Sequence, residues 1–498
     1  MGGDYPAPVP SLFRGLPLAL LAAMFLLSSG ASAAAPQPVV KGNRIVDSTT
    51  GDQFVPHGVN FPGYEYACKQ GWNYGEDGTR PAQIASTVAG IASWNINTVR
   101  LPLNQDCWLG DDGLPAGSGH TVAGYRESVE NFVNALNSAG IVAIVDIHWS
   151  GPDGVVADGL RPMPDNRSPA FWKSVATIFK DNPSVIFDLF NEPHSRWNAD
   201  DTKVFGLSWE CWANGGCMAP AERDLAQVSG LSWYRTVGMK KLTEVVRETG
   251  AAQPILLSGI DYANDLRGWL AHAPDDDQLI AGFHNYLEQR CRTRTCWDRE
   301  IAPVAERVPV LAAEFGQNDC GAPSHMNHFM DWADDHLIGY LAWAWWSLPD
   351  EGCHNFALVS DLDGTPLAPA GTALHSHLAS LPEVLPEPIK RVAPGLAIKR
   401  ARWKRPSLHL RIAISRKASK AIDVRIKMAR DPKSNRAPRT NRRLIMKRLR
   451  AGFGFADLRT AIPAGLKPVL VTADYPGDEL LLPKKVKRKP ASVSKITR

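Results

Sequence analysis

The sequence lacks an apolar segment long enough to cross a bilayer as a helix. Its longest apolar run extends from Leu16 to Leu27, about a dozen residues, whereas a membrane-spanning helix requires about 20. Arg14 precedes this run and the small residues Ala31-Ser32-Ala33 follow it, which is typical of a cleavable secretory signal. We therefore predict a signal peptide over residues 1–33 and a secreted, extracellular protein. An uncleaved anchor, and with it association with the cell surface, is the alternative.

The sequence also lacks the paired Cys-x-x-Cys spacing of structural metal sites, although it contains eight cysteines. An even number of cysteines in an exported chain favours disulfide bonds over metal binding. Short spacings suggest two pairs and leave four cysteines for the other two, among 105 possible arrangements. The predicted pairs are Cys68–Cys107, Cys211–Cys217, Cys291–Cys296 and Cys320–Cys353.

Acidic residues are scarce near the end of the chain. Residues 390–498 contain 31 Lys and Arg but only 6 Asp and Glu, so their net charge is +25. Because the whole chain carries only +4, residues 1–389 have a net charge of −21. This change marks a domain boundary, and the proline-rich residues 381–394 are typical of a linker. We predict a large domain over 40–380, a small basic one over 395–482, and a disordered basic tail over 483–498.

In the large domain, short β-rich segments alternate with amphipathic ones such as Tyr125–Ala139, Ala170–Lys180 and Tyr234–Thr249. Eight apolar strands separated by helices favour a parallel sheet closed into a (β/α)8 (TIM) barrel, and the length of this domain fits one. The predicted strands are Phe54–Asn60, Thr98–Leu103, Val142–His148, Val185–Asn191, Pro254–Gly259, Ile280–Tyr286, Pro309–Phe315 and Gly339–Trp346.

The small domain has a different pattern. Leu408–Ile414 and Ile422–Met428 alternate apolar and polar side chains, which is the two-residue period of half-buried antiparallel strands. We therefore predict a small all-β, sandwich-like domain after the barrel.

Aromatic residues are few in residues 395–482, which argues against a carbohydrate-binding module built on flat aromatic rings. They are Trp403, Phe453, Phe455 and Tyr475. The positive charge favours attraction to an anionic surface, such as cell-envelope polymers or lipid headgroups. Two alternatives remain, a solubilising spacer and docking against the acidic large domain. No nucleic-acid recognition motif is present, so no nucleic-acid partner is expected.

Polar and aromatic residues gather where the predicted barrel strands end. Because the carboxyl ends of parallel strands meet at one rim of a barrel, these side chains are expected to converge on one site. They are Arg100 in the second strand, His148 and Trp149 at the third, Asn191 and Glu192 at the fourth, His284 and Tyr286 in the sixth, Glu314 in the seventh, and Trp345 and Trp346 at the eighth.

Glu192 and Glu314 are the carboxylates of this set, and two carboxylates can divide the work of cleaving a glycosidic bond. One protonates the leaving oxygen while the other attacks the anomeric carbon, provided that they lie about 5–5.5 Å apart. Tyr286 and Arg100 are placed to keep Glu314 ionised, and His284 to lie near Glu192, which would separate the two pKa values. The pattern predicts a glycosidase that uses no metal and no cofactor.

The segment Phe190-Asn191-Glu192-Pro193-His194 resembles the Asn-Glu-Pro signature of glycoside hydrolase family 5, the cellulase family of retaining (β/α)8-barrel glycosidases. Four further segments match family landmarks in the same order, namely Asn97–Pro102, Asp146–His148, His284–Tyr286 and Ala313–Gly316. The resemblance covers roughly residues 42–375. It implies that Glu192 is the acid/base and Glu314 the nucleophile.

The resemblance also implies roles for the neighbouring side chains. Asn191 is expected to bind the sugar 2-hydroxyl group, Arg100 and Tyr286 to position the nucleophile, and His148 and His284 to line the subsite next to the scissile bond. A tryptophan of the eighth strand is expected to form the sugar platform.

The choice of platform residue follows from alternation along the strand, which favours Trp345 over Trp346. Trp149 is a further candidate for substrate binding, with packing of the loop as its alternative role.

The substrate follows less directly, because the subsites of such barrels lie on variable loops. Insertions follow three strands at Asn104–Thr121, Pro193–Leu231 and Glu288–Trp297. We predict an endo-β-1,4-glucanase that acts on β-linked polysaccharide or oligosaccharide. The alternatives are a β-mannanase, a β-1,3-glucanase, a glycolipid-cleaving glycosidase, a transglycosylase, and an inactive barrel that only binds carbohydrate.

Overall fold

The computed structural model describes residues 34–492 except for a few segments. The segments outside the description are 111–113, 115–117, 199, 224–231, 348–354, 382–395, 405–406, 414–421, 432–443, 450–454, 465, 476–483 and 489–490. The predicted signal peptide and almost all of the predicted linker therefore lie outside the described residues. Among the residues that are described, no helix is long and apolar enough to span a bilayer.

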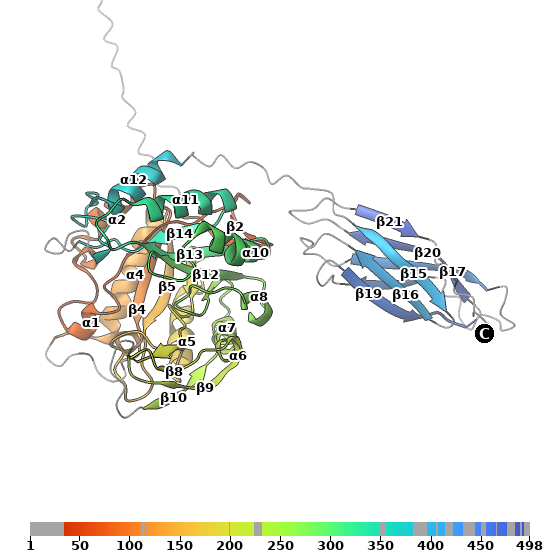
Figure 1. Ribbon diagram of the computed structural model, residues 1–498, viewed down its shortest axis with the longest axis horizontal. Helices are drawn as coiled ribbons and strands as arrows, with labels where there is room; N and C mark the ends of the chain where they lie inside the picture. The colour runs from red at the N-terminus through yellow and green to blue at the C-terminus, as the bar shows by residue number, and fades with distance from the viewer. Residues whose placement is uncertain are drawn as a thin grey trace, which may run out of the picture.

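Eight parallel strands close into a barrel in the order β11-β12-β13-β14-β3-β4-β5-β6 (Figure 1). All eight predicted strands are confirmed, although several are shorter than predicted. They are β3 (His57–Asn60), β4 (Thr98–Asn104), β5 (Val142–Trp149), β6 (Val185–Asp188), β11 (Ile255–Ser258), β12 (Leu279–Tyr286), β13 (Val310–Gly316) and β14 (Gly339–Ala342).

The barrel strands are apolar without interruption because both of their faces are buried. In β5, Val142 and Ile144 belong to an apolar cluster formed by alternate residues of several strands, which fills the barrel. Ala143 and Val145 belong instead to the larger cluster that includes the helices. A strand that packs against side chains on both faces carries no polar face, which explains why the sequence predicted these strands well.

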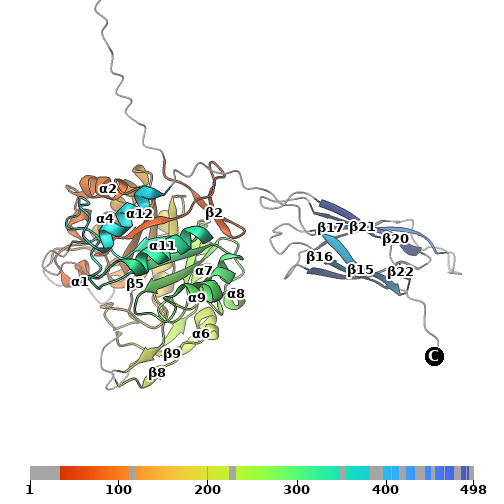
Figure 2. The ribbon, with the colours of Figure 1, turned by 45° about the horizontal axis from the view of Figure 1, so that its top comes forward.

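Helices surround the barrel on its outer side (Figure 2). The longer ones are α2 (Ile84–Ala92), α4 (Val122–Ser138), α5 (Ser168–Phe179), α7 (Met239–Glu248), α11 (Ser324–His336) and α12 (Ala370–Ser380). Short turns of helix complete the connections: α1 (Ala67–Gln70), η1 (Asp77–Thr79), α3 (Gln105–Leu109), α6 (Trp209–Asn214), α8 (Trp269–His272), α9 (Arg294–Cys296), η2 (Trp297–Ile301) and α10 (Ala302–Ala305).

One predicted helix, Tyr234–Thr249, is wrong in its first part. Residues Trp233–Val237 form strand β10, which pairs antiparallel with β9 (Gly215–Pro220), and helix α7 begins only after Gly238. The aromatic and β-branched residues of this segment favour a strand once a partner strand is available. Two further small sheets are present, β1 (Pro38–Lys41) with β2 (Arg44–Asp47), and β7 (Arg196–Trp197) with β8 (Lys203–Phe205).

Disulfide bonds stabilise the loops around the barrel. Three of the predicted pairs are confirmed, namely Cys68–Cys107, Cys211–Cys217 and Cys291–Cys296. Cys320 is also disulfide-bonded, while its predicted partner Cys353 lies outside the described residues.

The C-terminal residues form two four-stranded sheets, ordered β19-β16-β15-β22 and β18-β17-β20-β21. Leu408 and Ile412 from the first sheet and Val424 and Ile426 from the second share one apolar core, as in a sandwich. The strands are β15 (Ala397–Lys404), β16 (Ser407–Ala413), β17 (Ile422–Arg430), β18 (Leu444–Leu449), β19 (Phe455–Ala461), β20 (Leu466–Tyr475), β21 (Lys484–Arg488) and β22 (Ala491–Ser492).

The prediction of a disordered tail over 483–498 is wrong for its first part. Strand β21 pairs with β20, and its register sets Val486 opposite Ala473, which is fully buried. The short alternation Lys485-Val486-Lys487 therefore supplies one apolar side chain between two charged ones, which a half-buried edge strand requires.

Candidate active site

Arg100 is the centre of a buried charge network at the carboxyl end of the barrel strands. Its guanidinium group is fully buried and donates hydrogen bonds to four residues that lie in or just after three other strands, β3, β6 and β13. The acceptors are Glu314 Oε1 at 2.7 Å, Asp188 Oδ2 at 2.9 Å, Asn191 Oδ1 at 2.7 Å and Asn60 Oδ1 at 3.0 Å. Asp146 Oδ2 lies 3.1 Å from Nη2 of the same group.

The charges of this network depend on one another. Burial lowers the pKa of Arg100, but the carboxylates of Asp146, Asp188 and Glu314 outweigh burial, and the net effect raises that pKa. Burial raises the pKa of Asp146 to about 7 and that of Asp188 well above its ordinary value, although Arg100 opposes both shifts. One guanidinium cannot balance three buried carboxylates, so the network favours a proton on the Asp146–Asp188 pair.

Glu314, near the end of β13, is held on both of its oxygens. Arg100 donates to Oε1, and the hydroxyl group of Tyr286, at the end of β12, donates to Oε2 at 2.8 Å. The side chain of Glu314 is only 5% exposed. Both contacts that the sequence predicted for this carboxylate are therefore present, and both favour its charged form.

Glu192, which follows β6, lies beside Glu314 and contacts His284. Nδ1 of His284 lies 2.8 Å from Glu192 Oε1 and 3.5 Å from Glu314 Oε2. One oxygen of each glutamate and this nitrogen all lie within 4.8 Å of one another. Burial lowers the pKa of His284 to about 3, so the ring is neutral near neutral pH. The short separation of the two carboxylates suits direct attack by one of them on a sugar carbon. A wider separation of about 6.5–9.5 Å would be needed to leave room for an attacking water between them.

These three side chains are also of the kind and spacing that could bind a metal ion. However, Arg100 already provides a positive charge 2.7 Å from Glu314, which disfavours a second cation at the same carboxylate. Cys291, Cys296 and Glu300 form another close group, but the two cysteines are joined in a disulfide and offer no thiolate.

His148 and Trp149 end strand β5 on the same side of the barrel. The ring of His148 is stacked on that of Trp343, with centroids 5.3 Å apart and planes at 15°. Its Nε2 lies 3.5 Å from Asn191 Nδ2, and burial lowers its pKa to about 4. Trp149 is half-buried and lies 6.2 Å from the ring of Tyr66.

The choice of Trp345 as sugar platform is wrong. Its ring has no exposed surface and packs edge-on against Trp94 in the core, so it offers no face to a ligand. Strand β14 ends at Ala342, and the alternation on which the choice rested does not continue beyond it. Trp343, which is half-buried and stacked on His148, lies beside the network instead, with Trp346 6.3 Å away from it.

The sequence reasoning also missed Asn60, Asp146 and Asp188, which surround Arg100. A usable signal exists for the two aspartates, because each directly follows a run of apolar residues in its buried strand. A carboxylate at such a position needs a buried partner, and Arg100 on the neighbouring strand β4 is the available one.

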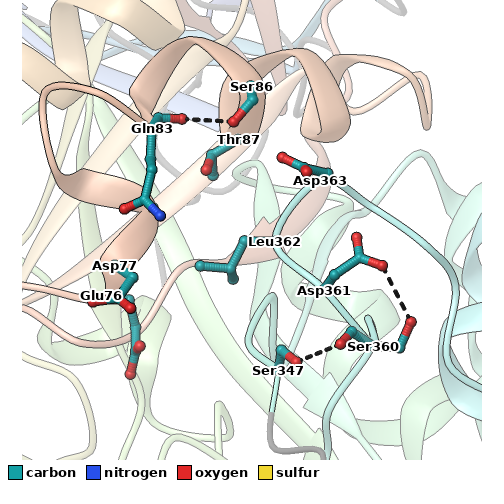
Figure 3. A pocket seen from close by; sticks show the side chains of 11 residues that line it. Glu76, Asp77, Gln83, Ser86, Thr87, Ser347, Ser360, Asp361, Leu362 and Asp363 are labelled. Carbon is teal, nitrogen blue, oxygen red and sulfur yellow. Dashed lines mark hydrogen bonds between the residues drawn. The ribbon is translucent and has the colours of Figure 1, made fainter.

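A hollow of about 360 Å³ lies between the segments that follow the adjacent strands β3 and β14 (Figure 3). Hydroxyl, amide and carboxylate side chains line it: Glu76, Asp77, Gln83, Ser86, Thr87, Ser347, Ser360, Asp361 and Asp363, with Leu362 among them. Glu76 accepts a hydrogen bond from Tyr66, whose ring lies near Trp149. The hollow therefore borders the site and offers groups that could bind sugar hydroxyls.

Comparison with known proteins agrees with this geometry. The family described as Cellulase (glycosyl hydrolase family 5) matches residues 50–348. This chain belongs to that family. It is a glycosidase that hydrolyses O-glycosyl compounds.

Among individual proteins of this family, the chain is similar to endo-beta-1,4-glucanase B of Emericella nidulans, with 29% identity over 293 residues, which are 55% of this chain and 77% of that protein. It is 30% identical to endoglucanase 1 of Saitozyma flava over 143 residues, 28% of this chain and 39% of the other. A solved beta-glucanase of Saccharophagus degradans in complex with cellotetraose is 19% identical, covers 75% of this chain and 97% of its own, and has a TM-score of 0.49.

Proposed function

We propose that this glycosidase is a secreted, retaining endo-β-1,4-glucanase with Glu314 as nucleophile and Glu192 as acid/base. The observation that supports this most strongly is the proximity of the two carboxylates, whose oxygens lie within 4.8 Å of each other. That distance fits direct attack by one carboxylate on the anomeric carbon, with no room for an intervening water.

The reaction proceeds in two displacements. In the first, Glu314 attacks the anomeric carbon while Glu192 gives its proton to the departing glycosidic oxygen, and a covalent glycosyl-enzyme forms. In the second, Glu192 takes a proton from water, whose oxygen attacks the same carbon and releases Glu314. Two inversions at one carbon leave its configuration unchanged.

The neighbours of Glu314 serve its role as nucleophile. Arg100 and Tyr286 both donate to it, so its carboxylate is correctly oriented before substrate arrives. The carboxylate of Glu192 has a different neighbour. It lies instead beside His284, whose neutral ring can donate to the ionised carboxylate or accept from the protonated one.

We also propose sugar-binding roles for side chains beside the two glutamates. Arg100 donates to Asn191 Oδ1, which fixes the amide plane, and the amide nitrogen, 3.5 Å from His148 Nε2, is the group that we propose donates to a sugar 2-hydroxyl. We assign Trp343 as the sugar platform, with His148 behind it, and Trp149 and Trp346 as flanking contacts. The hollow lined by Glu76 and Asp361 offers further groups that we propose bind sugar hydroxyls.

The choice of β-1,4-glucan rests on the relatives, one of which is named endo-beta-1,4-glucanase B and another endoglucanase 1. Secretion is supported by the signal-like residues 1–33 and by disulfides among the described cysteines. We propose in addition that the basic C-terminal domain attaches the enzyme to an anionic surface outside the cell.

The test is an assay of the mature protein on soluble β-1,4-glucan, β-1,3-glucan, β-mannan and aryl β-glycosides, with Glu314→Ala as control. New reducing ends from β-1,4-glucan, absent with the variant, are the expected result. Cleavage of another glycan alone would replace the substrate, longer products would indicate transglycosylation, and equal activity of the variant would reject the assignment of Glu314.

A further inference from the structure

The outer face of one C-terminal sheet carries a row of basic side chains. In β16, Leu408, Leu410 and Ile412 are buried while His409 and Arg411 are exposed. The register sets His409 opposite Arg402 of β15 on one side and opposite Arg459 of β19 on the other. All three side chains are exposed. They therefore form a straight row across three neighbouring strands.

A second row runs beside the first. Arg411 of β16 lies two residues along the strand from His409, and the register sets it opposite Arg400 of β15 and Asp457 of β19. The two rows thus contain five basic residues at six register positions. The row of Arg402, His409 and Arg459 has no acidic residue opposite it in the register.

The other sheet of the same domain treats its basic residues differently. Arg448 of β18 donates to Asp423 of β17 at 3.0 Å, so this pair is neutral. Arg425 of β17 lies opposite Met446 and Thr472, which carry no charge. Like charges close together across strands cost stability, whereas opposite charges contribute to it. The first sheet therefore sets basic residues directly opposite one another, whereas the described registers of the second sheet pair no two basic residues.

We propose that the face of Arg402, His409 and Arg459 binds an anionic polysaccharide with a carboxylate on its sugar units. Neighbouring strands lie about 4.8 Å apart, which is comparable to the length of one sugar unit, so an extended chain crossing the strands meets Arg402, His409 and Arg459 in turn. Cations held at the surface gain affinity by releasing counter-ions from such a polymer.

The observations favour a polysaccharide over a membrane. Proteins that lie on membranes insert apolar or aromatic side chains beside their basic ones. In the described part of this domain, the exposed large apolar side chain is Met446, which belongs to the opposite sheet. The proposal is independent of the barrel chemistry, since it concerns a face that the catalytic network does not use.

The test measures binding of the full chain to polygalacturonate from about 50 to about 200 mM salt. The variant Arg402→Thr/Arg459→Thr is compared with Arg425→Thr/Lys427→Thr, which removes the same charge from the other sheet. Threonine has a high propensity for strands, so both variants are expected to fold like wild type, and circular dichroism checks this. We expect the first variant to bind at least about tenfold more weakly, with a shallower salt dependence, and the second to bind within about twofold of wild type.

Three outcomes would overturn the proposal. Equal losses in both variants would mean that net charge alone attracts the polymer. Absence of binding at the lowest salt would remove the polymer as a partner, and tight binding to anionic phospholipid vesicles without binding to polygalacturonate would favour a membrane. Hydrolysis of soluble β-1,4-glucan is measured in parallel, and it should be unchanged in both variants. If the wild-type chain does not hydrolyse β-1,4-glucan, that result contradicts the proposed function of the barrel and not the proposal for this face.

Discussion

The barrel and the C-terminal domain handle charge in opposite ways. In the barrel, Arg100 and the carboxylates around it are enclosed at the strand ends with almost no exposed surface. In the C-terminal sandwich, apolar residues such as Val424 fill the interior and the basic residues stand on the outer faces. Buried charge is costly and persists only where each group has partners, whereas surface charge costs little. The enclosed charge thus belongs to the site proposed for the chemistry, and the exposed charge to the surface proposed for binding.

The largest effect is expected from Glu192→Gln, which removes the proton donor. Activity on β-glucan should fall by about 10²–10⁴-fold because the leaving oxygen is no longer protonated. Aryl β-glycosides with acidic phenols need no proton in the first step, so their first step should be nearly unaffected. Pre-steady-state release of the phenol checks this. Equal losses on both substrates would contradict the role of Glu192 as acid.

Arg100→Gln tests the buried side of the comparison. Removal of the guanidinium leaves Asp146, Asp188 and Glu314 without a cation, and we expect a loss of about 3–5 kcal/mol in the free energy of unfolding. Urea unfolding followed by tryptophan fluorescence measures it. Arg100→Lys keeps the charge but not the forked geometry, so it should recover stability more than activity. A stable and active Arg100→Gln variant would refute the network.

The tryptophans near β14 separate packing from binding. Trp345→Ala should lower the free energy of unfolding by about 3–5 kcal/mol, because it empties a fully buried position. Trp343→Ala should leave stability closer to wild type while raising KM or lowering kcat on oligosaccharides. Thermal melts and steady-state kinetics of both variants decide the matter. The reverse result would restore Trp345 as the platform.

The pH dependence of stability tests the burial of His148. Its pKa is lowered from 6.5 to about 4 in the folded protein, so between these values the unfolded chain binds a proton that the folded chain does not. Folding stability from this group is present above pH 6.5 and declines as the pH falls toward 4. Asp146, with its raised pKa, acts in the opposite direction, so the comparison uses His148→Asn, which leaves Asp146 in place.

The difference in Tm between wild type and His148→Asn is the measured quantity. The Tm of wild type should fall by several degrees relative to that of His148→Asn when the pH is lowered from 7.5 to 4.5. A difference that is independent of pH would show that His148 titrates alike in the folded and unfolded states.

The smallest effect is expected from Arg448→Gln, the surface counterpart of Arg100→Gln. Arg448 is also hydrogen-bonded to an aspartate, Asp423, but its side chain is 76% exposed. The free energy of unfolding of the C-terminal domain should hardly change, because an exposed ion pair is screened by water and salt. Chemical unfolding followed by circular dichroism checks this, and a loss as large as that of Arg100→Gln would erase the contrast between the two domains.

The fold could be predicted where physical constraints act locally. Strands buried on both faces, such as β5, are apolar throughout, and their order along the chain leaves few arrangements other than a barrel. The segment Tyr234–Val237 was mistaken for helix because its partner strand β9 lies in an inserted loop that the sequence pattern does not reveal. Val486 was overlooked because one apolar residue among lysines is too short a pattern.

The site was predictable in part. The contacts of Glu314 with Arg100 and Tyr286 follow from the strand order, since the three strands that carry these residues end at the same rim of the barrel. The platform could not be chosen by alternation, because the chain leaves the strand at Ala342 and the directions of the following tryptophans depend on tertiary packing. The partners of Arg100 required knowledge of which side chains point into the barrel.

The most direct test of the account is to trap the glycosyl-enzyme. Incubation with a dinitrophenyl 2-deoxy-2-fluoro-β-cellobioside should slow the second displacement, and peptide mass spectrometry then locates the sugar. One sugar is expected on the peptide that contains Glu314, and no attached sugar is expected in the Glu314→Ala variant. A label on Glu192, or a product whose anomeric configuration is inverted, would contradict it.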